Sequence, residues 1–280
     1  MGKRTSQLTQ LTAAQVAQGD FLPIVDVSAG QTKYVTVKDL TGLPDTGWLA
    51  TGESWAYSSW DSTRRIGIIT VPTDATTKYT PKMRVRFSQT TGGTKYGIIT
   101  YVTATTLTIH FPSGTTLNNE AITSPVYSPL DTPVGFPSNA ANWILETTST
   151  TTQSQLSPTN NVWYNPGSNS LALGPGVWDL GYKGSLECLK TGAGNSDALA
   201  TLSTANNSES DSDFTLWEFI GITGGTASNN VFPLTARKII SLTANSTYYL
   251  NVMCTTPSQS QLQWHGSISK TSIRAITAYL

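Results

Sequence analysis

Few residues of this chain could carry acid–base chemistry. The two histidines, His110 in "LTIHFP" and His265 in "LQWHGS", are the usual candidates for a base beside a nucleophile. A serine nucleophile for either histidine would be expected in a nucleophile elbow, Gly-x-Ser-x-Gly. The segment "GESWA" has the serine but lacks the second glycine of that pattern. We expect strand-surface or hydrogen-bonded histidines, and we predict no catalytic residue and no enzyme activity.

Glycoside cleavage would need a pair of carboxylates flanking the scissile bond. The chain holds 17 Asp and Glu residues, most of them in predicted turns. It also lacks the solenoid repeat that is typical of long polysaccharide-cleaving trimers. A polysaccharide depolymerase therefore stays an alternative that ranks below a non-enzymatic role.

Metal chemistry has one candidate in the acidic run "SESDSDF", where Glu209, Asp211 and Asp213 could supply oxygens to calcium. The run lacks the glycine and distal glutamate of an EF-hand, so a solvated loop is favoured and calcium binding stays open. Cys188 and Cys254, with two histidines, are too few for an all-Cys/His structural zinc site. We expect both cysteines to be small buried hydrophobic residues, with a disulfide between them as the alternative, and we predict no cofactor.

Sugar binding needs flat aromatic faces beside hydrogen-bonding Asn, Asp and Thr side chains. Trp163 and Tyr164 lie in the predicted loop "NNVWYNPGSN" and are our candidate contacts with a glycan. A place in the core or in a trimer interface is the alternative for this pair. Trp178 follows a turn and opens a strand pattern, and we expect it in the core.

The composition predicts β-structure to position these residues. Only 12% of the residues are charged, while Thr, Ser, Asn, Gly and Pro are plentiful. Thr is β-branched and suits a pleated strand, and Gly, Asn and Pro supply turns at short intervals. The chain is therefore expected to be all-β.

The charge balance argues against two kinds of partner. Lys and Arg number 17, equal to Asp and Glu, and no basic run exceeds Arg64–Arg65, so we expect no nucleic-acid partner. The sequence has no run of about 18 apolar residues and no apolar segment of a secretion signal near its start. We therefore expect a soluble protein without membrane insertion.

Three segments differ in pattern, and we place their bounds at residues 1–45, 46–136 and 137–280. In the first, "FLPIVDVS", the turn "AGQ" and "TKYVTVKDL" predict a two-stranded hairpin. A lone hairpin is marginal in water, so it needs a surface to pack on. That surface belongs either to another protein or to the next domain of this chain.

The middle segment, 46–136, predicts a small closed β-barrel of five or six short strands. In "MRVRFSQTTGGTKYGIITYV" the side chains of Met83, Val85 and Phe87 point one way, and those of Arg84 and Arg86 point the other. A Gly-Gly turn then reverses the chain.

The last segment, 137–280, predicts a jelly-roll β-sandwich. It carries seven or eight strand patterns separated by turn clusters such as "GAGNSD", "ANNSESDSD" and "TGGTASNN". The sequence has no heptad repeat, so an oligomer would be held by globular surfaces. The strand patterns "TSIRAITAYL" and "FTLWEFIGI" are our first candidates for such a surface.

The order of the segments resembles that of tailed-bacteriophage appendage proteins. The opening resembles a module at the front of tail fibres, head fibres and decoration proteins, whose pattern here consists of Gly19, Asp20, Asp26, Lys33, Asp39 and Leu40. The stretch from "GWLATGESWAYSSW" to "YSPLDTPVGFP" is similar to a small β-barrel module of phage virion proteins. "LGPGVWDLGYKGSLEC" and "STYYLNVMC" resemble the trimeric jelly roll of tumour-necrosis-factor type.

The resemblance implies a homotrimer in the virion, assembled in the host cytoplasm and docked on a capsid or tail protein through its N-terminal module. The candidate docking residues are the apolar residues of the hairpin, Phe21, Leu22, Ile24, Val25, Tyr34, Val35, Val37 and Leu40. The jelly roll would face outward and meet a host-surface glycan. The alternatives are a capsid decoration without a ligand and a tail-tip protein with a dedicated receptor.

Overall fold

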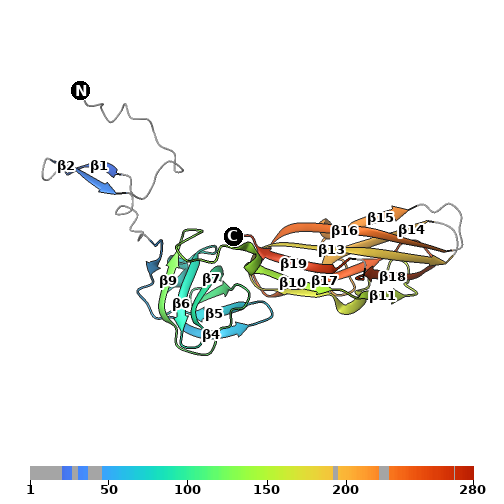
Figure 1. The fold of residues 1–280 in the computed structure, drawn as a ribbon, viewed down its shortest axis with the longest axis horizontal. Helices are drawn as coiled ribbons and strands as arrows, with labels where there is room; N and C mark the ends of the chain where they lie inside the picture. Colours follow the sequence, from blue (N-terminus) through green and yellow to red (C-terminus); the bar gives the residue numbers. More distant parts are fainter. Residues whose placement is uncertain (1–20, 27–30, 37–45, 192–194, 221–226, 268) are drawn as a thin grey trace, which may run out of the picture.

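The computed structural model describes residues 21–26, 31–36, 46–191, 195–220, 227–267 and 269–280. These residues form antiparallel strands and the connections between them (Figure 1). The helical elements among them are 3-10 turns of three or four residues, η3 (Ala75–Thr77), η4 (Ala140–Trp143), η5 (Pro166–Ser168) and η6 (Ser212–Phe214). The predicted all-β class is confirmed.

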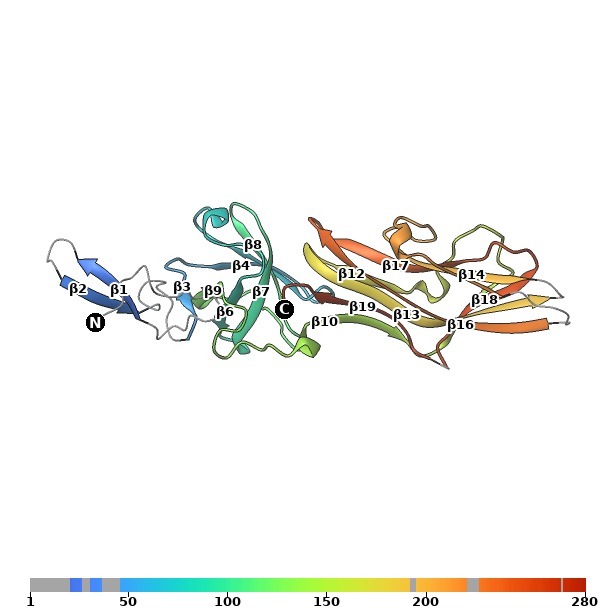
Figure 2. The same cartoon turned by 90° about the horizontal axis from the view of Figure 1, so that it is seen from above.

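The predicted hairpin is present as two antiparallel strands, β1 (Phe21–Asp26) and β2 (Gln31–Thr36). Phe21 faces Thr36 and Asp26 faces Gln31. Within the described ranges neither strand pairs with any other strand, and Figures 1 and 2 show the hairpin apart from the next sheet. Of the candidate docking residues, Val37 and Leu40 lie outside the described residues, and the structure describes only the backbone of the other six.

The middle of the chain forms one antiparallel sheet in the spatial order β3-β9-β6-β7-β8-β5-β4. Its strands are β3 (Leu49–Ala50), β4 (Ala56–Asp61), β5 (Ile66–Thr70), β6 (Arg84–Gln89), β7 (Gly93–Val102), β8 (Thr106–His110) and β9 (Thr123–Ser128).

The closed barrel expected for this segment is wrong, because β3 and β4 end the pairing order and do not pair with each other. The strand β3 has only two residues, and β4 is interrupted by a register shift between Tyr57 and Ser59, so neither offers a regular edge for closure. The sheet instead curls around its own core, where the rings of Trp55 and Phe87 lie 6.2 Å apart.

Strand β6 has the predicted alternation. Val85 and Phe87 are buried in the core of the curled sheet, while Arg84 and Arg86 lie on the opposite face. That opposite face is covered, since the Arg84 guanidinium lies 5.1 Å from the Phe136 ring. The arginine face of the strand therefore belongs to the interior of the protein.

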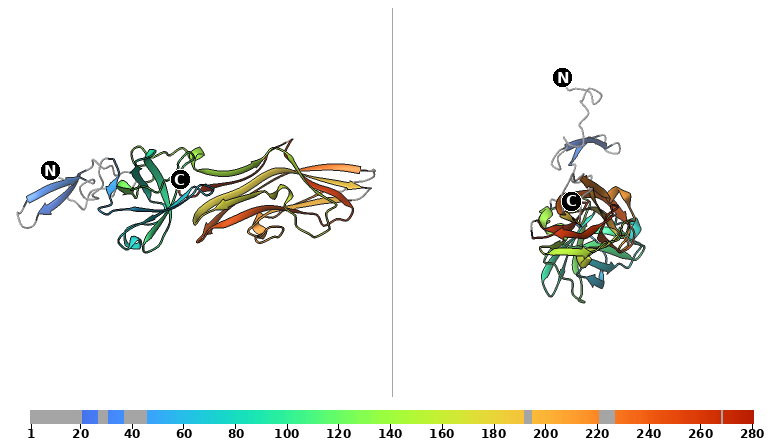
Figure 3. Two further views of the ribbon diagram at one scale, coloured as in Figure 1. Left: turned by 90° about the horizontal axis from the view of Figure 1, so that it is seen from below. Right: turned by 90° about the vertical axis from the view of Figure 1, so that its right-hand side faces the viewer.

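The last part of the chain is a sandwich of two antiparallel sheets (Figure 3). The first sheet contains β10 (Ile144–Ser149), β11 (Thr152–Leu156), β13 (Gly176–Thr191), β16 (Ala227–Leu242), β18 (Gln259–His265) and β19 (Thr271–Thr277). The second contains β12 (Ser170–Leu173), β14 (Ser196–Ser203), β15 (Leu216–Ile220) and β17 (Ser246–Met253) in the order β12-β17-β14-β15.

The pairing follows the jelly-roll order. The long strand β13 pairs with β16 on one edge and with β19 and β18, end to end, on the other. In turn β10 pairs with β19 and β11 with β18. With β10–β11 and β18–β19 each counted as one interrupted strand, eight strands divide into two four-stranded sheets, and the chain changes sheet at each connection except that between β14 and β15, as in a jelly roll.

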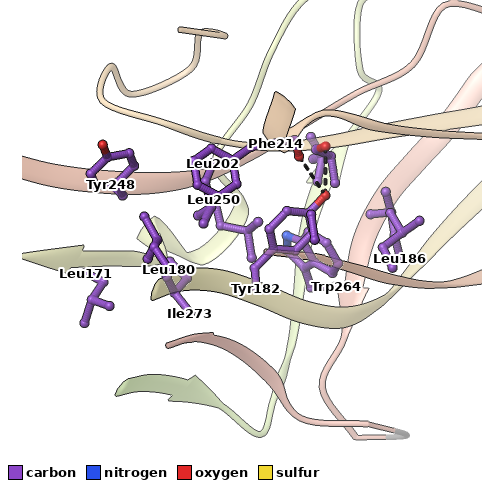
Figure 4. Close-up of a cluster of buried hydrophobic side chains, with 14 of the residues drawn as sticks. Leu171, Leu180, Tyr182, Leu186, Leu202, Phe214, Tyr248, Leu250, Trp264 and Ile273 are labelled. Carbon is purple, nitrogen blue, oxygen red and sulfur yellow. Dashed lines mark hydrogen bonds between the residues drawn. The ribbon is translucent and has the colours of Figure 1, made fainter. Parts of the chain in front are cut away.

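The core of the sandwich is a layer of buried apolar side chains between the sheets (Figure 4). The Tyr182 hydroxyl donates a hydrogen bond inside this layer, where the main-chain oxygens of Ala200 and Phe214 lie 3.0 and 3.2 Å away. Cys188 and Cys254 are both buried and free, so the predicted hydrophobic role is confirmed and the disulfide is not formed. Trp178 is fully buried, as predicted.

The curled sheet and the sandwich share a buried junction. His110 of β8 is fully buried there, with its ring 5.9 Å from that of Trp143 and 5.0 Å from that of Trp178. Burial, together with the positive charge of Arg65, lowers the pKa of His110 to about 3. The imidazole is therefore neutral at physiological pH and acts as a packing residue.

Arginine side chains cross the junction to main-chain oxygens of the sandwich. Arg65 donates to the oxygens of Asn142 and Ile144, and Arg64 Nε donates to Leu173 O at 3.3 Å. A charged guanidinium loses hydration when it is buried, so these acceptors fix where the two parts meet.

Arg84 is the most completely buried of these arginines, at 1% exposure. It donates to three main-chain oxygens, those of Lys82 (2.7 Å), Asp131 (2.9 Å) and Tyr279 (2.7 Å). Through Tyr279 the C-terminal end of the chain is held against the curled sheet, and Figure 3 shows it at the junction.

Asp197 ties β14 to the segment after β17. Its buried carboxylate accepts the backbone N–H and hydroxyl of both Thr255 and Thr256, with the two Thr256 bonds at 2.9 and 2.7 Å. Burial by itself would raise the pKa of Asp197, but these hydrogen bonds hold it below its ordinary value.

The substitution Arg84→Met is expected to lower the free energy of unfolding by about 3 kcal/mol, because three buried oxygens lose their donor. Denaturant unfolding measures the loss. The matched control is Arg86→Met. The Arg86 guanidinium lies over the Trp48 ring at 4.9 Å, and loss of this contact should lower the free energy of unfolding by only about 0.5–1 kcal/mol. Equal effects of the two substitutions would contradict the role given to Arg84.

The substitution Asp197→Asn should lower the free energy of unfolding by about 2 kcal/mol at neutral pH. The amide NH2 group of the asparagine would face the threonine donors and could not accept their hydrogen bonds. A lowered folded-state pKa gives stability that is present above the unfolded value of about 3.9 and is lost as pH falls below it. The difference between wild type and variant should therefore shrink on acidification. Urea unfolding at a series of pH values tests this, and a difference independent of pH would contradict it.

Candidate functional site

The predicted glycan pair, Trp163 and Tyr164, is divided between two sides of a sheet. Tyr164 forms an antiparallel bridge with Val252 of β17, with N–H···O distances of 2.8 and 2.7 Å. Its side chain packs against the sandwich core, and its hydroxyl accepts the Thr159 N–H at 2.9 Å. Tyr164 is thus turned away from the outer surface.

Trp163 belongs to the outer face, because successive residues of an extended segment point to opposite sides. The isolated Tyr164–Val252 bridge and the bond from Asn161 N–H to Cys254 O lie on either side of Met253, so Val162 and Trp163 together lie opposite Met253 in an irregular step. Met253 pairs with Leu199 of β14, and Leu199 pairs with Trp217 of β15. We call this row, consisting of Trp163, Met253, Leu199 and Trp217, the tryptophan strip.

The tryptophan strip crosses the whole second sheet. Three interstrand spacings separate its two tryptophans, which makes the row about 14 Å long. Trp217 is 62% exposed, and Trp163, Leu199 and Met253 are half-buried. The indole Nε1 of Trp217 donates to Asp197 Oδ2 at 3.4 Å, and this contact orients the Trp217 ring.

A cluster of asparagines lies beside the strip. Asn165, two residues beyond Trp163, donates through Nδ2 to Asn206 Oδ1 at 3.0 Å. Its backbone N–H donates to Asn207 Oδ1 at 2.8 Å, and the Asn207 N–H donates to Asn251 Oδ1 at 3.2 Å. The buried Oδ1 of Asn165 has no hydrogen-bond partner among the described residues. We call these four residues the asparagine cluster.

The acidic run considered for calcium is occupied by a cation of the chain itself. Lys238 Nζ lies 2.7 Å from a carboxylate oxygen of Asp211 and 2.7 Å from one of Asp213. Asp211 also caps η6 by accepting the Asp213 N–H, while Glu209 accepts the Thr215 hydroxyl. The described part of the chain contains no group of three or more His, Cys, Asp or Glu residues that could hold a metal ion.

The outer face of the first sheet carries a different set of side chains, and we call it the first-sheet face. Three of its apolar side chains are exposed, namely Ile239 (66%), Leu156 (66%) and Val231 (40%). Near Ile239, which pairs with Asp179, a groove of about 220 Å³ runs over β10, β19, β13 and β16.

The groove floor is Gly181, and arginines flank it. Gly181 pairs with Arg237 on β16 and with Arg274 on β19, and Arg274 pairs with Glu146 on β10. Arg237 forms a salt bridge with Asp179. Within the described residues, Glu146, Arg274 and Lys183, which all line the groove, make no ion pair, so this face presents unpaired charges of both signs.

His265 lies on the same sheet between a serine and a glutamate. Its Nδ1 is 3.1 Å from Ser267 Oγ, and its Nε2 is 3.4 Å from Glu187 Oε2. Nucleophilic catalysis would also need N–H donors aimed at an oxyanion. The nearby N–H groups of Gly266 and Ser269 already donate to the oxygens of Trp264 and His265, so they do not supply such donors.

Sequence reasoning named Trp163 and the strand pattern "FTLWEFIGI", which contains Trp217, but it did not place them in one row with Leu199 and Met253. Leu199, Trp217 and Met253 lie far from Trp163 in the sequence and meet it only through strand pairing. The alternation within "SDALATLS" was the available signal, because it separates inward Ala198 from outward Leu199.

Among the described residues, the helical elements are all too short to span a membrane. No protein-family model matches the sequence, and no curated protein matches it either.

Three solved structures illustrate what the fold is similar to. The protein of the infectious bursal disease virus VP2 subviral particle has a TM-score of 0.26 and 12% identity, over 92% of this chain and 68% of its own. The protein of the T13 particle of the same virus has a TM-score of 0.22 and 10% identity, over 89% of this chain and 64% of its own. A Cry1Da tryptic core of Bacillus thuringiensis has a TM-score of 0.18 and 9% identity, over 94% of this chain and 59% of its own. At these TM-scores the likenesses carry no argument about function.

Proposed function

We propose that this protein is a structural appendage of a phage virion, a head or tail fibre or a decoration protein. Its hairpin docks on a capsid or tail protein, and its sandwich assembles into a homotrimer. The observation that carries the proposal is the hairpin β1–β2, whose outer strand edges are unpaired within the described residues. Two strands alone are marginally stable in water, so a partner that adds strands or covers a face would complete them.

The joined sheet and sandwich support the same role. The buried arginines and the His110 packing hold the two parts as one elongated body behind the hairpin (Figure 2). Such a body keeps the far end of the sandwich at a fixed distance from the curled sheet. Adsorption to a cell surface would use that end, whereas a decoration protein would only cover the shell.

The first-sheet face supports self-association. Its exposed Ile239, Leu156 and Val231 would be shielded from water by a second copy, and burial of such side chains is the main driving force of association. The unpaired Glu146 and Arg274 allow opposite charges to meet across copies. The threefold number comes from the resemblance of the last segment to trimeric jelly rolls.

The substitution Ile239→Arg is expected to convert the trimer to monomers, because a charge would enter an apolar contact. Light scattering coupled to gel filtration measures the mass. The matched control Val134→Arg places the same charge on a residue that is 63% exposed and lies outside the sandwich strands, and it should leave the mass unchanged. A monomeric wild type, or a trimeric Ile239→Arg variant, would contradict the assembly.

Removal of residues 1–45 is expected to abolish attachment to particles and to leave the unfolding temperature of the remainder unchanged, since the junction contacts among the described residues come from residues after 45. Incorporation is measured by blotting purified particles, and stability by thermal unfolding. Truncated protein that attaches normally would refute docking through the hairpin. A clearing halo around purified protein on host lawns would instead favour a depolymerase.

A further inference from the structure

The tryptophan strip and the asparagine cluster lie on the second sheet, opposite the first-sheet face that we propose for self-association. We propose that together they bind a neutral oligosaccharide. This inference names a ligand class for the outward sandwich. It rests on the proposed function only for the location of the glycan, which is the host surface.

The strip offers an apolar platform for sugar rings. Trp217 is 62% exposed and oriented by Asp197, while Trp163 closes the other end of the row. Indole rings present a flat apolar face on which the C–H side of a pyranose stacks. Met253 and Leu199 fill the interval, so a short oligosaccharide would meet a continuous surface about 14 Å long.

The asparagine cluster supplies hydrogen bonds beside that platform. Asn206 and Asn207 are exposed, and each is fixed by its side-chain oxygen, which accepts from Asn165. Their Nδ2 groups have no partner among the described residues and remain able to donate. A sugar hydroxyl can both donate and accept, so it can accept hydrogen bonds from these exposed Nδ2 groups.

The charges around the strip favour a neutral ligand over an acidic one. The rows of the strip and cluster contain no Lys or Arg, and the carboxylates of Asp197 and Glu209 lie at their margins. The nearby cation Lys238 is neutralised by Asp211 and Asp213. A uronic acid or phosphate group would therefore be repelled without a compensating partner.

The test uses the full-length protein on an array of defined neutral and acidic bacterial oligosaccharides, followed by calorimetry with the best-bound neutral glycan. Trp163→Ala and Trp217→Ala are each expected to weaken binding at least tenfold. The control Ile239→Ala alters an equally exposed side chain of the opposite sheet and should leave the affinity per site unchanged. Thermal unfolding of each variant checks that it is folded.

Asn206→Asp provides a second, gentler variant. It keeps the acceptor that holds Asn165 and replaces the Nδ2 donor by a carboxylate, so affinity for the neutral glycan should fall. No binding on the array, a preference for acidic glycans, or affinity insensitive to both tryptophan substitutions and to Asn206→Asp would overturn the proposal. The molecular mass of the same samples separates the glycan-binding proposal from the trimer proposal. A monomer that binds glycan would refute the trimer and leave glycan binding supported.

Discussion

The structure depends on the burial of arginine charges at the junction between the curled sheet and the sandwich. Arg65 and Arg84 lose hydration there and recover hydrogen bonds from main-chain oxygens, including those of Asn142 and Tyr279 across the junction, and Arg84 also lies 3.6 Å from a carboxylate oxygen of Asp131. A buried guanidinium without acceptors is strongly destabilising, so the two parts are stable together in one arrangement. Neutral His110, packed on Trp143 and Trp178, fills the apolar remainder of the same contact.

Close packing at this junction also explains a glycine. A Cβ atom built on Gly174 would lie 1.7 Å from Cδ1 of Ile66, so the Ile66 side chain would have to shift to admit a larger residue there. Both outer faces of the sandwich carry exposed apolar side chains, among them Ile239 on the first sheet and Trp217 on the second. One has aliphatic residues and unpaired charges of both signs, and the other has tryptophans beside neutral amides.

That difference between the faces assigns them different partners in our proposals. An aliphatic surface with charges of both signs suits a second copy of the same chain, because each charge can meet its opposite. Tryptophan beside carboxamides suits hydroxyl-rich ligands, which need both an apolar face and hydrogen bonds. The acidic run, which could have been a cation site, is internally neutralised by Lys238.

The sequence by itself determined the all-β class, the hairpin strands, the alternation of Val85 and Phe87 with Arg84 and Arg86, and the buried state of Cys188 and Trp178. These follow from residue type and a period of two, which are local properties. Only the tertiary structure decided that the middle sheet stays open, that the arginine face of β6 is covered, and that Lys238 occupies the acidic run. It also decided that Trp163 and Tyr164 point to opposite sides and that Trp163 shares a row with Trp217. Each of these outcomes depends on pairing between distant strands, and strand register is set by the packing of the whole fold.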